Sequence, residues 1–240
     1  MRKRGELAGL APDRLRAMAD AGPVVEECYR VLRKTRDNVV SELLRHVEDF
    51  REFDHYPEGD VFDAETHAQY YYHAHAHAHG GDPRLDEHGH FHTFLRRPGM
   101  PADALPLAGE AAESIAHLVA VSINRAGYPV ALFTTNRWVT GETWYGPADV
   151  CRMLPRFAID HARPSWPVNR WLTAMLSLFA PEAEDLLLAR DQAVATHRAR
   201  HPTDDVLEDR RLEITALARI SVEQRLRDLK SLLADARQEV

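Results

Sequence analysis

The feature that most constrains the fold is the sequence HAHAHAHGGDPRLDEHGHFH at positions 73–92, in which seven of the twenty residues are histidine. Histidines on both sides of the GGDP segment are spaced two residues apart, which is the periodicity of a β-strand and not of a helix. Two glycines and a proline between the two halves are typical of a turn. The sequence therefore predicts a β-hairpin with a loop over 80–87, whose strands carry histidine on one face.

The position of the loop decides which histidines face one another. A loop over 80–87 produces three facing pairs: His79 with His88, His77 with His90, and His75 with His92. Facing residues have Cβ atoms about 4.5–5.5 Å apart, so two imidazoles can reach one ion through bonds of about 2.0–2.1 Å. The other face carries small and aromatic residues between Tyr70 and Leu95, which suit packing against helices.

This histidine face predicts a metal site. Crowded imidazoles repel one another when protonated near neutral pH, because their ordinary pKa is about 6.5, and a metal ion binds the neutral form instead. The alternative is a solvated, tag-like polar face. Glu87 is the predicted general base. The predicted ligands are His73, His75, His88, His90 and His92, whereas His77 and His79 are either surface histidines or a second site.

The ligand types limit the choice of metal. Imidazole-rich sites suit zinc, copper, iron and nickel. Cys28 and Cys151 lie far from the histidines in sequence, which excludes a structural zinc finger and a blue-copper centre. The prediction is one transition-metal ion, with iron or copper favoured and zinc as the alternative.

A second polar stretch, FTTNRWVTGETW at 133–144, is typical of a small-molecule pocket because aromatic, amide and guanidinium groups occur together in it. Arg137 is the predicted anchor for a substrate carboxylate. The alternative places the tryptophans in the core. The predicted substrate-binding residues are Tyr71, Asn136, Arg137 and Trp138.

Two further features have two interpretations each. The segment HYPEGDVFD at 55–63 either covers the site and supplies a carboxylate or forms a plain turn. His117 is either a ligand from a neighbouring strand or a buried structural histidine. We interpret the remaining histidines, including His55, as ordinary.

The rest of the chain alternates helical and strand patterns. Residues 12–48 and the chain from Pro147 onward have helical spacing, and we predict two final helices over 204–219 and 222–237. HLVAVSI and YPVALFTT predict a second hairpin. The fold class is therefore α+β, a small antiparallel sheet of about four strands in two hairpins, flanked by N- and C-terminal helices. We expect one domain over 1–240, composed of a helical N-terminus (1–50), a histidine-rich sheet region (51–146) and a helical C-terminal half (147–240).

Charge and hydropathy exclude several classes of partner. The formal net charge of −7 does not favour binding to nucleic acid. No run of about 18 apolar residues is present, and the basic start MRKRGEL is not followed by an apolar segment, so we expect no membrane partner and no signal peptide. The two cysteines form no CxxC pair and are expected to be reduced thiols of a cytoplasmic protein that acts on a small molecule.

The segments QYYYHAH, EHGHFHTF and LFTTNRWVTGE together resemble an uncharacterised bacterial family, described as a domain of unknown function, over about His55 to Gly146. This resemblance implies no established activity. The HxH and glutamate arrangement is also similar to the cupin metal motif, but only locally, because the second cupin motif with its glycine and later histidine is missing.

These features lead to several functional hypotheses. The first is a metalloenzyme that oxidises a small molecule with dioxygen at iron or copper. A zinc or manganese hydrolase, in which Glu87 activates a metal-bound water, is the enzymatic alternative. A non-catalytic metal buffer, chaperone or sensor is the second class. A helical interaction protein that forms a homodimer through its C-terminal helices is the third.

Overall fold

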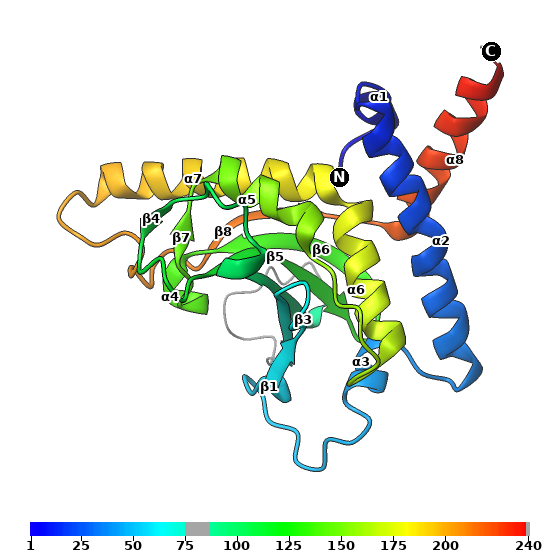
Figure 1. The fold of residues 1–240 in the computed structure, drawn as a ribbon, viewed down its shortest axis with the longest axis horizontal. Helices are drawn as coiled ribbons and strands as arrows, with labels where there is room; N and C mark the ends of the chain where they lie inside the picture. Colours follow the sequence, from blue (N-terminus) through cyan, green and yellow to red (C-terminus); the bar gives the residue numbers. More distant parts are fainter. Residues whose placement is uncertain (75–86, 239–240) are drawn as a thin grey trace.

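A six-stranded antiparallel sheet crosses the middle of the protein, with helices along its upper and right-hand sides in Figure 1. The structure is a computed structural model that describes residues 1–74 and 87–238. The strand order is β1-β2-β3-β5-β6-β8. The strands are β1 (Tyr56–Phe62), β2 (Ala68–Ala74), β3 (Glu87–Arg96), β5 (Ile115–Asn124), β6 (Pro129–Thr135) and β8 (Ile214–Arg219). A separate two-stranded sheet pairs β4 (Pro106–Ala108) with β7 (Trp144–Tyr145).

The predicted mixture of helices and strands is confirmed, but the predicted number of about four strands is wrong because both edge strands were missed. β1 contains Pro57 and Gly59, residues that weaken a strand signal and are tolerated at a sheet edge with an irregular register. β8 falls where the sequence predicted a helix over 204–219. Its alanine-rich sequence ITALAR has good helix formers, and pairing with β6 overrides that local preference.

The helices agree better with the prediction. The predicted helical region 12–48 divides at Asn38, whose side chain caps the second piece by accepting from the backbone amides of Val40 and Ser41. No helix in the described part of the chain is long and apolar enough to cross a membrane. The helices are α1 (Arg4–Ala8), α2 (Pro12–Lys34), α3 (Val39–Leu43), α4 (Arg137–Thr140), α5 (Pro147–Met153), α6 (Trp166–Leu178), α7 (Ala180–Arg200) and α8 (Val222–Gln238), with 3-10 turns at Arg97–Gly99 and Leu154–Arg156.

One face of the sheet packs against helices. The Tyr70 hydroxyl donates a hydrogen bond of 2.7 Å to Asn169 on α6, and the Phe91 ring lies 5.6 Å from the Trp171 ring. Tyr72 extends the same buried face. Because side chains alternate along a strand, the residues between these aromatics point to the opposite face. That opposite face carries the histidines.

Candidate metal centre

The register of β2 with β3 determines which side chains meet on the histidine face. His73 lies opposite His90, and Tyr71 lies opposite His92. This register differs by four residues from the one predicted with a loop over 80–87, which placed His75 opposite His92. An even shift keeps every side chain on its face and changes only its partner. The predicted ligand His75 and the histidines His77 and His79 lie outside the described residues.

Three histidines converge on this face. His73, His90 and His92 each offer a ring nitrogen within 4.8 Å of the other two. The ring centroids are 4.4 Å apart for His73 and His90, 4.7 Å for His90 and His92, and 5.2 Å for His73 and His92. The Nε2 atoms of His73 and His90 are separated by 2.6 Å. Bonds of about 2.0–2.1 Å in tetrahedral geometry need about 3.3 Å between donors, so a small outward movement of one ring admits an ion.

A carboxylate holds the middle histidine of this cluster. Oε1 of Glu87 lies 2.7 Å from Nδ1 of His90, so the ring presents its Nε2 to His73. A carboxylate behind a ligating imidazole fixes the ring orientation and raises its basicity. The sequence predicted Glu87 as a general base that starts on the other face of the strand or in the turn. In the structure its carboxylate stands behind His90, which is the place of a positioning residue.

His117, on the neighbouring strand β5, contacts His92, the most buried member of the cluster. Nδ1 of His92 lies 3.0 Å from Nε2 of His117, and the backbone amide of His117 donates to the buried carboxylate of Glu142. His92 is 0% exposed, and its Nε2 has no hydrogen-bond partner among the described residues. Burial lowers the pKa of His92 well below its ordinary value, and the neighbouring histidines add to this effect. Burial also lowers the pKa of His117, to about 3. The rings of His92 and His117 are therefore both neutral, and the neutral imidazole is the form that binds metal.

His88 is a predicted ligand that the structure places away from the cluster. The register between β3 and β5 shifts at Glu87 to Gly89, where β3 contributes one residue more than β5. Such a bulge re-aims the side chains next to it. The His88 ring stacks near Tyr72, with Nδ1 2.6 Å from the Tyr72 hydroxyl, and Glu87 occupies the side of His90 instead.

Aromatic rings line the cluster on the β2 side. The ring of Tyr71, a predicted substrate-binding residue, lies 5.0 Å from His92 and 5.6 Å from His73. His55, which the sequence interpretation treated as ordinary, stacks on Tyr71 at 3.5 Å, and its Nδ1 lies 2.9 Å from a carboxylate oxygen of Asp60. The segment 55–63 therefore does approach the cluster. It contributes an imidazole next to Tyr71, with the Asp60 carboxylate behind that ring.

His55 also lines an open cleft of about 1010 Å³. Asp60, Gln69 and Arg96 line the same cleft, and their side chains form a chain in which Arg96 donates to Gln69 and Gln69 donates to Asp60. His55 is thus part of the cleft wall and is in ring contact with His73, at a centroid distance of 6.2 Å. The cleft reaches the edge of the histidine cluster at this residue.

The residues of the predicted pocket wall at 136–138 contact the chain that follows α7. Arg137 forms an ion pair of 2.6 Å with Glu208, and the Trp138 indole donates to the Leu212 carbonyl across 2.8 Å. The buried amide of Asn136 donates to the carbonyl of Val206. All three side chains therefore bind the segment after α7, residues 206–212, to the chain that follows β6. The Arg137 guanidinium is thus paired with a carboxylate of the protein itself.

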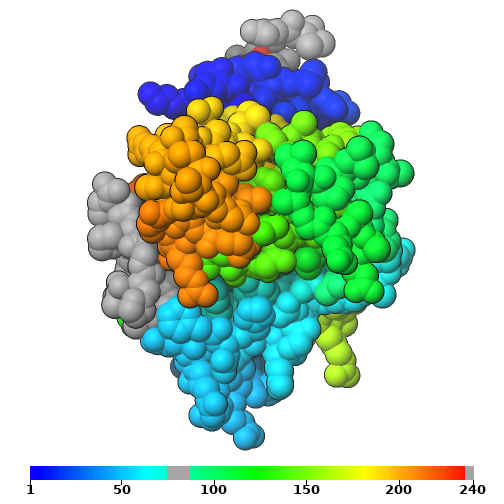
Figure 2. Space-filling view, turned by 90° about the vertical axis from the view of Figure 1, so that its left-hand side faces the viewer, coloured from blue at the N-terminus to red at the C-terminus, as the bar shows by residue number. Residues whose placement is uncertain are grey.

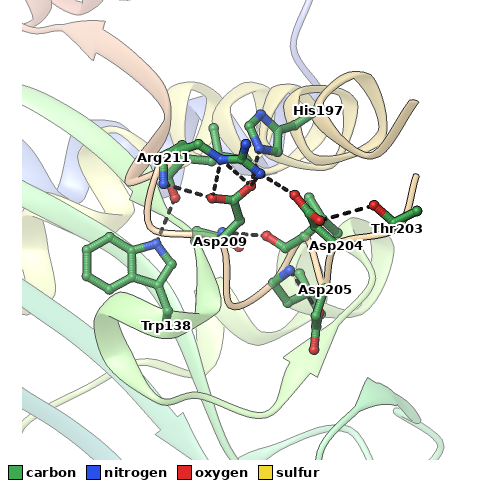
Figure 3. A network of polar contacts seen from close by, with 11 residues as sticks. Trp138, His197, Thr203, Asp204, Asp205, Asp209 and Arg211 are labelled. Atoms are coloured by element: carbon green, nitrogen blue, oxygen red, sulfur yellow. Dashed lines mark hydrogen bonds and ion pairs between the residues drawn. The ribbon is translucent and has the colours of Figure 1, made fainter. Parts of the chain in front are cut away.

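Figure 3 shows the neighbouring part of this polar network, in which Asp209 is held by Arg211 and by His197. The loop that carries it is drawn in orange in Figure 2 and lies beside the green central segments of the chain. Arg211 lowers the pKa of the Asp209 carboxyl, with a further contribution from His197. These contacts stabilise the conformation of the loop that follows α7.

The comparisons with known proteins identify the family. A family model described as "Domain of unknown function (DUF6969)" matches residues 19–220. The chain belongs to this family. No curated protein and no solved structure matches the chain. The resemblance noted in the sequence is confirmed, and the DUF6969 match is wider than the region from His55 to Gly146. It runs from α2 to the end of β8 and includes every strand of the main sheet.

Proposed function

We propose that this DUF6969 protein is a metalloenzyme that holds one transition-metal ion on His73, His90 and His92 and acts on a small molecule. The proposal rests on one observation: three imidazoles converge within 4.8 Å on one sheet face. A catalytic metal site usually has three protein ligands and one open coordination position. Structural sites, in contrast, have all their positions filled by protein ligands.

The surroundings of the cluster support a metal rather than a plain hydrogen-bond network. Two of the three rings have their Nδ1 atoms engaged from behind, His90 by Glu87 and His92 by His117. Metal-ligating histidines almost always have such a partner on the second ring nitrogen. The unsatisfied buried Nε2 of His92 is the atom that a metal ion would satisfy.

The proposed reaction is oxidation of a small molecule with dioxygen at iron or copper. The cluster contains imidazoles only, a donor set that suits copper and three-histidine iron sites. Aromatic rings lie close to it, with Phe133 at 4.8 Å from His90 and Phe94 at 6.2 Å from His92. The hydrolytic alternative has less support, because its expected base, Glu87, is engaged with His90.

Each residue of the site has a defined part in this proposal. His73, His90 and His92 hold the ion, which supplies the oxygen chemistry when bound. Glu87 and His117 orient two of these rings. We assign the cleft beside His55 as the route by which the substrate reaches the site, because His55 lines that cleft and contacts His73.

Elemental analysis of untagged protein tests the proposal. The protein must be purified without a histidine-affinity step, because the chain itself would bind a nickel column. We expect about one iron or copper ion per chain in the wild type, and loss of most of it in a His90→Ala/His92→Ala double variant, since two of three ligands are then missing. The measurement is metal content by mass spectrometry after gel filtration.

A matched control changes two histidines outside the cluster, His46 and His201, to alanine. This control should keep the metal content of the wild type. Full metal content in the His90→Ala/His92→Ala variant would contradict the site assignment. Zinc as the bound metal would favour the hydrolytic alternative, and several exchangeable ions per chain would favour a non-catalytic metal binder.

A smaller effect is expected from Glu87. Glu87→Ala removes the carboxylate behind His90, and we expect metal affinity to fall by about 10- to 100-fold, the usual consequence of losing such a partner. Glu87→Gln retains a hydrogen-bond acceptor and should lose less. Competition with a chromophoric chelator measures the affinity. The exposed Glu113→Ala is the control, and an equal loss in Glu113→Ala would show that the effect is not specific to His90.

A further inference from the structure

The sheet register places other side chains next to the histidines on the same face. Directly paired residues leave a sheet on the same side, so two rows can be followed across four strands. The first row is His73, His90, Ser122 and Ala131. The second row is Tyr71, His92, Ala120 and Phe133.

Ser122, in the first row, carries a buried polar atom that no hydrogen bond between described residues satisfies. It is 0% exposed, and its Oγ has no hydrogen-bond partner among the described residues. A buried hydroxyl without a partner is costly, and each such group in a folded protein calls for an explanation such as a bound ligand. His92 Nε2 is a second atom of this kind on the same face, one row away.

The residues around Ser122 are small. Ala120 lies two residues before it on β5, and Ala131 lies opposite it on β6. The first large side chain beyond them in the second row is Phe133, whose ring contacts His90 edge-on at 4.8 Å. The histidines therefore lie next to a patch of small side chains formed by Ala120, Ser122 and Ala131. Within the described residues the Ser122 hydroxyl of this patch has no hydrogen-bond partner, and the Phe133 ring lies at its edge.

We propose that Ser122 is a binding residue of the metal site and that its hydroxyl hydrogen-bonds the small molecule or anion that occupies the open coordination position. This inference rests on the proposed function, because it needs the ion on His73, His90 and His92. A serine hydroxyl both donates and accepts, so it suits an oxygen or nitrogen atom of either kind. The small side chains of Ala120 and Ala131 suit a ligand group of a few atoms next to Ser122. The larger part of a bigger ligand would point away from this patch.

Azide binding to the cobalt-loaded, untagged full-length protein tests this inference. Cobalt(II) replaces the native ion and gives a visible spectrum that changes when azide enters the open position. We expect Ser122→Ala to weaken azide binding by about tenfold, because one hydrogen bond to the bound anion is lost. Ser122→Thr retains a hydroxyl and should stay within about threefold of the wild type. Cobalt affinity should be unchanged in both variants.

A matched control is Ser114→Ala. Ser114 is also buried, but its Oγ is already hydrogen-bonded to the Tyr145 hydroxyl at 2.7 Å. Azide affinity should therefore match the wild type in this control. Unchanged azide affinity in Ser122→Ala, or equal losses of cobalt and azide affinity, would overturn the role of Ser122 but not the assignment of the metal ligands His73, His90 and His92. Wild-type protein that binds no cobalt would overturn the proposed function and this inference together.

Discussion

His92→Ala is expected to weaken metal binding by about 100- to 1000-fold. Structural zinc sites with four ligands bind with about 10–16 kcal/mol, which is about 2.5–4 kcal/mol for each ligand. His92 is fully buried and pre-oriented by His117, so water cannot easily replace it. His73 is partly exposed, and His73→Ala should therefore fall at the lower end of this range. Competition titration against a chromophoric chelator measures both affinities.

The matched control for this prediction is His88→Ala. His88 lies on the same strand, two residues before His90, but its ring contacts Tyr72. We expect the metal affinity of this variant to stay within about threefold of the wild type, because it loses a contact with Tyr72 and not a metal ligand. A loss in His88→Ala as large as that in His92→Ala would support the ligand set predicted from the sequence instead.

The histidine face itself was predictable from the sequence. The spacing of two in HAHAH and HGHFH predicts a common face whatever the register, because side chains alternate along a strand, and His73, His90 and His92 do share one. The facing pairs were not predictable to the same degree. They depend on where the hairpin loop begins, and the glycines of GGDP do not define that residue.

The bulge at Glu87 to Gly89 was the main local feature that the sequence interpretation missed. It moves His88 away from the cluster and brings Glu87 to His90. Gly89 was the available signal, because an isolated glycine in a strand pattern often indicates a bulge or a close approach. The structure shows the close approach: a Cβ at Gly89 would overlap the His73 carbonyl oxygen and the Tyr72 hydroxyl.

The roles of residues far apart in the sequence could not be predicted in this way. Arg137 and Asn136 have the composition of a pocket wall, yet their partners are Glu208 and Val206, about 70 residues later. His55 is also far from β3 in sequence, and it meets the cluster through its ring contacts with Tyr71 and His73. Local patterns identify chemistry-bearing residues, whereas tertiary pairing decides which of them meet.

The second large effect is expected on stability. Glu182→Ala should lower the free energy of unfolding by about 3–5 kcal/mol, because it leaves the Arg225 guanidinium buried without its carboxylate. Arg225 on α8 is 0% exposed and Glu182 on α7 is 2% exposed. The same carboxylate accepts from the backbone amide of Arg2, so it joins the N-terminus to both helices. Urea denaturation in the presence of a chelator measures the change without a contribution from bound metal.

Glu184→Ala is the control on the same helix. Glu184 pairs with Arg14 across 2.7 Å, but both side chains are partly exposed, and such pairs contribute about 0–1 kcal/mol. A Glu182→Leu/Arg225→Met double variant should be more stable than Glu182→Ala, since replacing both charges by apolar groups leaves no buried charge unpaired. If the double variant were less stable than Glu182→Ala, the penalty would come from lost packing and not from the unpaired guanidinium. Metal affinity should be unchanged in all three variants, because Glu182 and Arg225 connect helices and lie outside the histidine cluster.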